Sequence, residues 1–341
     1  MKKSSEHIAE SVFLTNVFYS NKQNKTKILY FRCLEEGKSY EYFEEELNKI
    51  WDNINHSFMN RQIDKLQKIV NTQNIMEAIN LGRLDDKYKE TEYWVIDDEY
   101  FKLTPESDFR EFENKFKRNV LQNYKRAETS LKYADKEEYL SKKVDSYNKN
   151  VNQVVSYFNS NGAIVRKVQL STYLSMVQNV NLTRSGWNQT MSDSTRLGRE
   201  VFIIPYHPFS CSYCVLYQNR PLTKTEVESI IGVEAYEQVG DILHPNCKCT
   251  LSIFWDYKQI KHQDYTPMEK ERMYDVRQKV NSLTLEKSNL RTDLKIANIL
   301  GDVAKQDTIK GKISVINSNI RELKKTLPTE ALKKQVVAIK R

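Results

Sequence analysis

The sequence has few of the residues that build phosphate-binding loops, and it lacks the short motifs of several common enzyme classes. Only nine of its 341 residues are glycine. It contains no Walker loop, no HExxH and no GxSxG, the motifs that hold nucleotide phosphates, a catalytic zinc ion or a nucleophilic serine. The sequence therefore gives no support to a P-loop NTPase, a zincin peptidase or an α/β-hydrolase.

Long apolar runs are also missing. No run reaches the roughly 18 residues that a membrane-spanning helix needs, and 39% of the residues are hydrophobic while 29% are charged. The first residues are basic, but Glu6, His7 and Glu10 stand where a signal peptide needs an apolar stretch. We expect a protein without a membrane-spanning segment, made in a reducing cytoplasm.

Cysteine is scarce, yet four of the five cysteines are clustered. A CxxC pair and a CxC pair are separated by 33 residues, and one histidine precedes each pair by four or three residues. A CxxC turn brings two thiolates close enough to share a tetrahedral ion, which a second pair can complete. The candidate metal ligands, from which a subset of four is needed, are His207, Cys211, Cys214, His244, Cys247 and Cys249.

A structural zinc ion is the favoured occupant of this cluster, and two alternatives remain open. The thiols can pack as small buried groups, or two of them can oxidise to a disulfide outside the cell. Because a CxC pair is tighter than a CxxC pair, three cysteines with His207 or His244 fit as well as four cysteines. A nucleic-acid deaminase would need His-x-Glu, whereas Pro and Phe follow His207. We predict no catalytic residues and no enzyme.

The patterning predicts an α+β fold that is predominantly α-helical. Residues 1–150 form an expected helical region, because Phe43, Leu47, Trp51, Ile54 and Phe58 follow one another at spacings of three and four. A second aromatic row has the same helical spacing and consists of Phe109, Phe112 and Phe116. We interpret both rows as core, with a surface that docks on a portal or capsid as the alternative.

Residues 151–262 form the expected core domain, a small α/β unit with short strands. Residues 164–170 look extended, and the helical segment after them closes at Gly198. The run REVFIIPYH suits a buried strand stopped by Pro205, and residues 250–255 suit a second strand. Between these strands, Thr223 and Glu226 form a capping box that opens a short helix. Because each cysteine pair lies at a strand end, we expect the strands to bring the pairs together.

Residues 263–341 contain two apolar rows at helical spacing with Gly301 between them, which predicts a helical hairpin or a coiled coil. From residue 266 onward there are 17 basic and nine acidic residues, so this segment carries the whole net charge of +8. A basic tail attracts polyanions through counterion release, and a solvated helical face is the alternative. The candidate DNA contacts are Lys305, Lys310, Lys312, Arg321, Lys324, Lys325, Lys333, Lys334 and Arg341.

Three segments within about residues 160–260 resemble minor head proteins of tailed bacteriophages. VRKVQLSTYLSMVQNV is similar to a family stretch with a Tyr-x-x-Met helix, here Tyr173 and Met176. REVFIIPYHPFSCSYCVLYQNRPLT is similar to the family's strand and Cys-containing turn, and HPNCKC to its HPNCRC or HPNCRH ending. The chain resembles the phage minor capsid protein 2 family and the related phage Mu protein F family. It departs from them at Tyr217, where the family has Trp, and at Asn219, which replaces a Gly but can adopt the left-handed turn conformation.

The resemblance implies a low-copy virion protein that acts in head morphogenesis. Such a protein is made in the host bacterial cytoplasm and lies inside the head near the portal. Its implied partners are the portal or major capsid protein and packaged double-stranded DNA, whose ejection it assists. Two other functions stay open, a phage-associated enzyme or toxin of the Mu F type that modifies nucleic acid or ADP-ribosylates, and a zinc-stabilised nucleic-acid-binding protein. The zinc-stabilised nucleic-acid-binding protein is disfavoured, because the basic residues gather in the tail and not around the cysteines.

Overall fold

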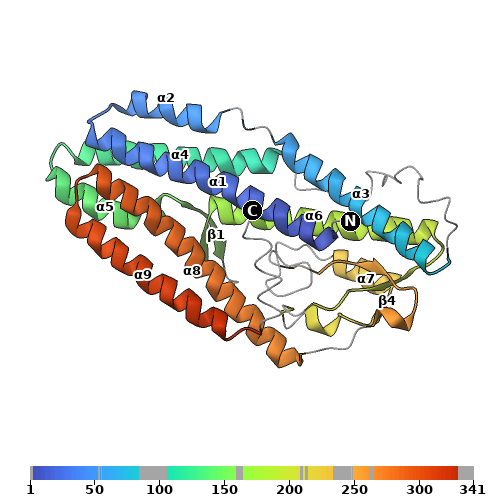
Figure 1. The fold of residues 1–341 in the computed structure, drawn as a ribbon. Helices are drawn as coiled ribbons and strands as arrows, with labels where there is room; N and C mark the ends of the chain where they lie inside the picture. The colour runs from blue at the N-terminus through green and yellow to red at the C-terminus, as the bar shows by residue number, and fades with distance from the viewer. Residues whose placement is uncertain are drawn as a thin grey trace.

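Long helices that run side by side make up most of the molecule, and a small sheet lies at one end (Figure 1). The computed structural model describes residues 3–52, 54, 56–83, 106–158, 164–207, 210–211, 214–232, 247, 249–260 and 265–328. Within these residues the fold is mainly α-helical with short antiparallel strands, as the sequence predicts. No described helix is both long enough and apolar enough to cross a membrane.

In the described part of the chain, five helices precede strand β1: α1 (Ser4–Glu35), α2 (Tyr40–Trp51), α3 (Ser57–Asn80), α4 (Glu106–Ser130) and α5 (Lys136–Asn150). The apolar row expected to continue from residue 43 to residue 58 is divided between α2 and α3. Trp51 ends α2, and the backbone of Asp52 is extended, with ψ at 155°. Polar Asp and Asn side chains favour such breaks because they hydrogen-bond to the nearby backbone.

Aromatic side chains fill the core between these helices. The rings of Phe43 and Tyr124 stack with their centroids 4.0 Å apart, and Tyr30 meets both rings edge-on. From the second aromatic row, Phe116 is fully buried and Phe112 packs on Tyr173 of the later helix α6. The two rows therefore belong to the core, with Ile54, Phe58 and Phe112 only partly buried.

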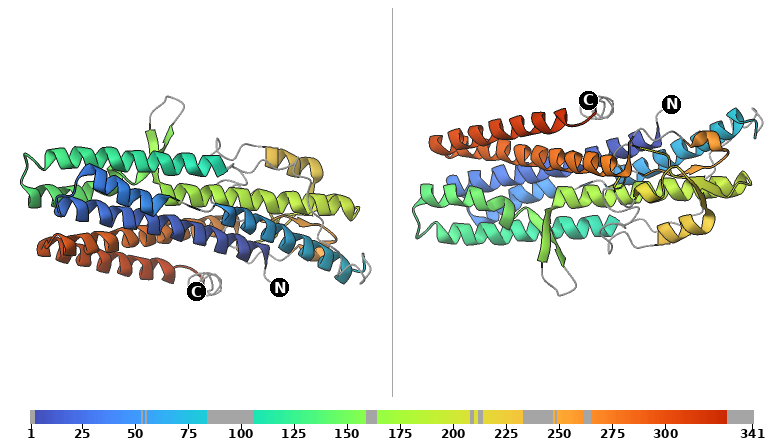
Figure 2. Two further views of the ribbon diagram at one scale, coloured as in Figure 1. Left: turned by 90° about the horizontal axis from the view of Figure 1, so that it is seen from above. Right: turned by 90° about the horizontal axis from the view of Figure 1, so that it is seen from below.

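The central segment begins with the antiparallel hairpin of β1 (Gln153–Phe158) and β2 (Ile164–Gln169), which projects from the helical body (Figure 2). Helix α6 (Leu170–Arg196) follows directly and packs against α1 and α3. It ends as predicted, because Gly198 adopts a left-handed φ of 66° that suits glycine after a helix. Most of α6 is buried although its sequence is polar.

A three-stranded antiparallel sheet follows, in the order β4–β3–β5. The central strand β3 (Val201–Ile203) pairs with β4 (Pro221–Thr223) and with β5 (Ser252–Ile253). The two predicted strands are thus neighbours, whereas β1 and β4 were not predicted. Helix α7 (Lys224–Gly232) begins at the predicted capping box, in which Thr223 N donates to Glu226 Oε2 at 2.8 Å.

The C-terminal part forms the predicted hairpin of two long helices, α8 (Pro267–Ile299) and α9 (Val303–Lys325). Gly301 forms the turn between them with φ at 68°. Helix α8 also contacts α1 and α5, and its residue Ile296 belongs to the largest core. That core takes side chains from all three of the expected domains, whose division stays a prediction.

Candidate metal centre

The first cysteine pair lies in a loop that the end of β3 closes. Ile204 forms a parallel bridge with Gln218, and Asn219 donates its N–H to the Ile204 carbonyl at 2.9 Å. Asn219 has φ at 61°, so it adopts the left-handed conformation expected of this Gly-like position. Inside this closed loop, the short 3₁₀ helix Cys214–Leu216 follows Cys211.

Helix α6 holds the second cysteine pair through its carbonyl groups. Asn179 Nδ2 donates to the Cys247 carbonyl at 2.8 Å, and Trp187 Nε1 donates to the Cys249 carbonyl at 3.0 Å. Both donors are buried, and an unpaired buried donor costs about 1–3 kcal/mol. These two hydrogen bonds therefore fix the backbone of the CxC pair immediately before β5.

The thiols of the two pairs converge. The sulfur atoms of Cys214, Cys247 and Cys249 all lie within 4.8 Å of one another. The Cys214 and Cys247 sulfurs are 3.6 Å apart. Two Zn–S bonds of about 2.3 Å at a tetrahedral angle place sulfurs roughly 3.8 Å apart. The three buried cysteines thus lie close enough to bind one metal ion, and all five cysteines of the chain are free thiols.

Backbone N–H groups point at two of the sulfurs. Cys214 N donates to Cys211 Sγ at 3.4 Å, and Cys249 N donates to Cys247 Sγ at 3.5 Å. Hydrogen bonds to the charged form of an acid stabilise that form. Each pair therefore carries a donor that favours the thiolate at its first cysteine, which is the form that binds metals.

Two polar side chains reach Cys249. Gln218 Nε2 lies 3.5 Å from its sulfur, and His207 Nε2 lies 3.4 Å from it. Gln218 is held by Ser210, whose hydroxyl donates to Gln218 Oε1 at 2.5 Å. His207 therefore occupies a position suited either to a fourth ligand or to a hydrogen bond with the Cys249 sulfur.

Contacts among the thiols, together with burial, decide the protonation of the cysteines and of His207 in the protein alone. The neighbouring thiols and burial raise the pKa of Cys214 far above its usual range. The hydrogen bond with Cys214 lowers the pKa of Cys249, but Cys247 and burial outweigh it, so that pKa is also raised. Burial lowers the pKa of His207 to about 4, so this ring is neutral at pH 7. A divalent cation reverses the thiol shifts because a coordinating thiol loses its proton.

From the predicted ligand set, the structure brings Cys214, Cys247 and Cys249 within reach of one ion. Cys211 contacts Cys214 and His207 contacts Cys249, whereas His244 lies outside the described residues. Sequence reasoning did not assign roles to Gln218, Asn179 or Trp187. The large tryptophan in the polar sequence of α6 is the local signal that could have indicated a buried contact, but its partner is 62 residues away.

The predicted DNA contacts divide into three groups. Lys305 Nζ is largely buried and pairs with Asp145 at 3.1 Å, so it is engaged within the molecule. The other described members lie on α9 and are exposed or partly exposed: Lys310, Lys312, Arg321, Lys324 and Lys325. Outside the described residues are Lys333, Lys334 and Arg341.

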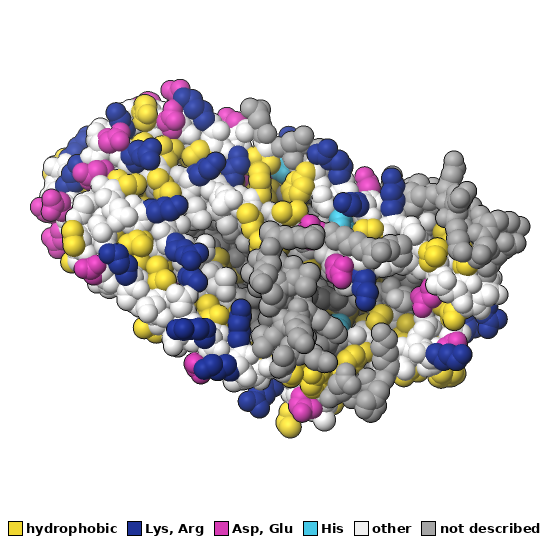
Figure 3. Space-filling view, in the orientation of Figure 1, with side chains coloured by type: hydrophobic (Ala, Val, Ile, Leu, Met, Phe, Trp, Pro, Cys, Tyr) yellow, Lys and Arg dark blue, Asp and Glu magenta, His cyan; other side chains and the backbone are white. Residues whose placement is uncertain are grey.

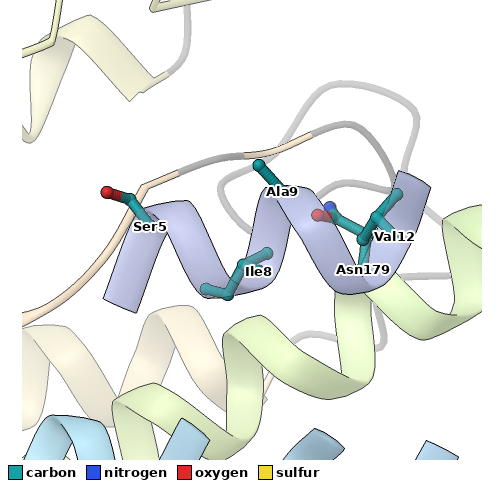
Figure 4. Close-up of a pocket in the computed structure, with 5 residues that line it drawn as sticks. All are labelled: Ser5, Ile8, Ala9, Val12 and Asn179. Carbon is teal, nitrogen blue, oxygen red and sulfur yellow. The ribbon is translucent and has the colours of Figure 1, made fainter. Parts of the chain in front are cut away.

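Two cavities lie elsewhere on the described part of the molecule. One has a volume of about 40 Å³ and lies between Ile8 and Val12 of α1 and Asn179 of α6 (Figure 4). Ligand pockets are usually about 300–1,000 Å³, so this space is too small for a drug-sized ligand. The other is an open groove of about 480 Å³, lined by α2 and α4 residues of both charges, among them Glu111 and Lys117.

No family model, no curated protein sequence and no solved structure matches this chain.

Proposed function

We propose that this chain is a minor head protein of a tailed bacteriophage, acting in head assembly and not as an enzyme. In this proposal it associates with the portal or inner capsid, contacts packaged DNA and assists its ejection. The central unit around the cysteines forms a second, smaller core beside the helical one. The helices on either side make the contacts with its partners.

The observation that carries the proposal is the meeting of the three family-like segments in one unit. Asn179 of the first segment hydrogen-bonds to Cys247 of the HPNCKC segment. Gln218 and His207 of the second segment both contact Cys249. These segments span residues 165 to 249, and residues of the first two segments contact the cysteines of the third. These contacts support the proposal that the three segments act as one structural unit.

In the proposed protein a structural zinc ion holds this unit together. Cys214, Cys247 and Cys249 supply three thiolates, and Cys211 or His207 supplies the fourth ligand. An ion held by the loop before β4 and by the CxC pair before β5 joins two segments that have little regular structure. Metal binding to such a site contributes directly to folding free energy.

DNA contact is proposed for the exposed side of α9. This helix carries six basic and two acidic residues, a net of +4. By helical geometry, Lys310, Arg321, Lys324 and Lys325 lie along one stripe. Figure 3 shows Lys and Arg side chains over the part of the surface that α8 and α9 form. Such a stripe suits sequence-independent contact with phosphates.

The head assignment is tested by mass spectrometry of purified virions from the phage that encodes this chain, alongside empty and DNA-filled heads. We expect a few copies per particle, found in the head fraction. If the protein is missing from assembled heads and from procapsids, the proposal is wrong.

The zinc part of the proposal is tested by metal analysis of the full chain, purified under reducing conditions. We expect one zinc ion per chain, and its absence removes the zinc part of the proposal.

The DNA contact is tested with the full chain and a charge-reversed variant, K310E/R321E/K324E/K325E. We expect the variant to lose most binding to double-stranded DNA, with the salt slope reduced by roughly 0.9 per lost phosphate contact. A matched control reverses four exposed lysines outside α9, Lys49, Lys65, Lys132 and Lys142. Equal losses in both variants would show that net charge matters and that the α9 stripe does not.

A further inference from the structure

Polar side chains form a buried row along the side of α6 that meets α1 and α3. The members of the row follow one another at spacings of three and four residues, which places them on one side of the helix. All of them are buried, and Leu182 is the one apolar member. The row consists of Ser171, Ser175, Gln178, Leu182, Ser185, Gln189 and Asp193. Because most of these side chains are polar, the hydrophobic effect contributes less to this contact than to an apolar one.

Helix α1 runs antiparallel to α6 along the first half of this row. Three contacts show the order: Ser171 N donates to Gln23 Oε1 at 3.0 Å, Asn16 Nδ2 donates to Ser175 Oγ at 3.3 Å, and Ile8 shares a small apolar cluster with Leu182. Gln178 lies between the second and the third of these contacts. It therefore faces the turns of α1 between residues 8 and 16.

Gln178 does not form a hydrogen bond in this position. Its side chain is 1% exposed, and neither its Nε2 nor its Oε1 reaches a partner in the part of the chain that the structure describes. Among the same described residues, the hydroxyl groups of Ser171 and Ser185 also lack a partner. A buried polar group without a partner destabilises the closed contact. Water can satisfy such a group when the contact opens.

The first turns of α1 bring little apolar surface to the contact. Of the apolar side chains in the described residues 4–18, Ile8 alone is buried, whereas Phe13 and Leu14 are 45% and 43% exposed. The second half of α1 differs, because Tyr30 and Phe31 lie in the largest core. The two halves of this one helix are therefore held by different forces.

Hydrogen bonds to α3 also hold the first turns of α1. His7 Nε2 lies 2.9 Å from the Gln62 carbonyl, and Ser11 Oγ donates to Gln62 Oε1 at 3.1 Å. When a contact opens, such groups exchange a protein partner for water, so the net contribution of each hydrogen bond is small. These bonds orient α1 without closing the contact firmly.

The same turns of α1 cover a residue that supports the cysteine cluster. The cavity of about 40 Å³ lies between these turns and Asn179 of α6 (Figure 4). Asn179 Nδ2 donates to the Cys247 carbonyl at 2.8 Å. Separation of α1 from α6 at this point would uncover the residue that fixes the CxC backbone.

We propose that residues 4–16 of α1 form a strap that detaches from α6 as a unit while the rest of the fold stays intact. Opening breaks the Asn16–Ser175 hydrogen bond and separates Ile8 from Leu182, and it hydrates Gln178. The aromatic core keeps the second half of α1 in place, so the opening ends before Tyr19. The strap depends neither on the assignment to a phage head nor on a bound metal.

Hydrogen exchange of the full wild-type chain, followed by mass spectrometry, tests the strap directly. Amides of residues 7–16 should exchange at least about a hundredfold faster than those of residues 24–34, because local openings need less free energy than global unfolding. Low concentrations of urea should accelerate the first group less than the second. Fraying of a helix end predicts a gradual rise in protection along residues 7–16, whereas the strap predicts one common value.

Gln178→Leu tests the role of the polar row. It removes the unpaired amide from the closed contact, so exchange of residues 7–16 should become about tenfold slower, within the cost of one unpaired buried group. Gln122→Leu is the matched control, because Gln122 is exposed on α4, and it should leave this exchange unchanged.

Gly311→Ala tests whether the opening is local. This substitution favours α9, which stays folded when the strap opens, so exchange of residues 7–16 should not change. If Gly311→Ala slows this exchange, or if residues 7–16 are protected as strongly as residues 24–34, they open only with the whole fold and the proposal is overturned. Wild-type exchange in Gln178→Leu overturns the role of the polar row. The comparison of the two groups uses wild-type protein, so a variant that fails to fold does not weaken it.

Discussion

Asp193 shows how single hydrogen-bonding residues hold the interior of α6. Its carboxylate is buried and accepts hydrogen bonds from the side-chain amides of Asn71, Asn74 and Gln189, each at 2.8 Å. Two of these donors come from α3, so the carboxylate joins α3 to α6. Such a network stabilises a polar interface only when its members are satisfied.

Replacing Asp193 with alanine should destabilise the protein by about 3 kcal/mol at neutral pH, because it leaves three buried amide donors without their acceptor. Urea unfolding of the full chain, followed by circular dichroism, measures the change. The control is Asp64→Ala, which removes an exposed carboxylate from α3 and should change the free energy of unfolding by less than about 0.5 kcal/mol. Equal effects of the two variants would contradict the role given to the network.

The pH dependence of stability should also report on Asp193. Burial raises the pKa of its carboxyl group, and the three amide donors only partly oppose that shift. A raised pKa in the folded state contributes stability below the unfolded pKa that is lost as pH rises through the folded pKa. Relative to Asp193→Asn, which does not titrate, the wild type should therefore gain unfolding free energy as pH falls from 7 toward 4. A constant difference over this range would contradict the raised pKa.

At the scale of elements, local signals predicted the helix ends best. The capping box at Thr223 and the glycine after α6 depend on residues within one turn of the helix, and both predictions are confirmed. The missed strand β4 has only three residues and begins with Pro221, so its own sequence carries almost no strand pattern. It is a strand because Phe202 of β3 lies opposite Leu222, a contact that depends on the folded chain.

The turn between α8 and α9 offers a clean test of such a local signal. Gly301→Ala should destabilise the protein by about 1 kcal/mol, because the left-handed φ of 68° is unfavourable for a residue with a Cβ. Gly311→Ala is the matched control. Gly311 lies inside α9 with no atom near an added Cβ, so alanine should stabilise by roughly 0.5–1 kcal/mol. Thermal unfolding of both variants measures the change in stability of each relative to the wild type. A change of the same sign in both variants would contradict the role given to the turn.

At the scale of the whole molecule, the sequence predicted the cysteines that lie close enough to bind a metal ion and the two strands beside them, but not the helix that contacts them. Close spacing in CxxC and CxC is local, and it identified the cysteines directly. The hydrogen bonds from Asn179 and Trp187 of α6 to the Cys247 and Cys249 carbonyls join segments far apart in the chain. No local pattern encodes such contacts, since a buried lysine in a helix looks the same in sequence as an exposed one.

The same limit applies to the ion pair that docks the C-terminal hairpin on the body. Lys27 of α1 is 1% exposed and pairs with Asp293 of α8, with Asn148 Oδ1 3.3 Å from its Nζ. Lys27→Met should destabilise the protein by roughly 3–5 kcal/mol, because it leaves the Asp293 charge buried without its partner. The double variant K27M/D293L should cost less than the two single variants together, as urea unfolding of all three can measure. On the other side of the hairpin, Lys305 pairs with Asp145, whose side chain is 71% exposed. Asp145→Asn should therefore cost at most about 1 kcal/mol. If the single variants at Lys27 and Asp293 are additive, the two charges do not act as a pair, and apolar packing around Ile296 must hold the hairpin in place.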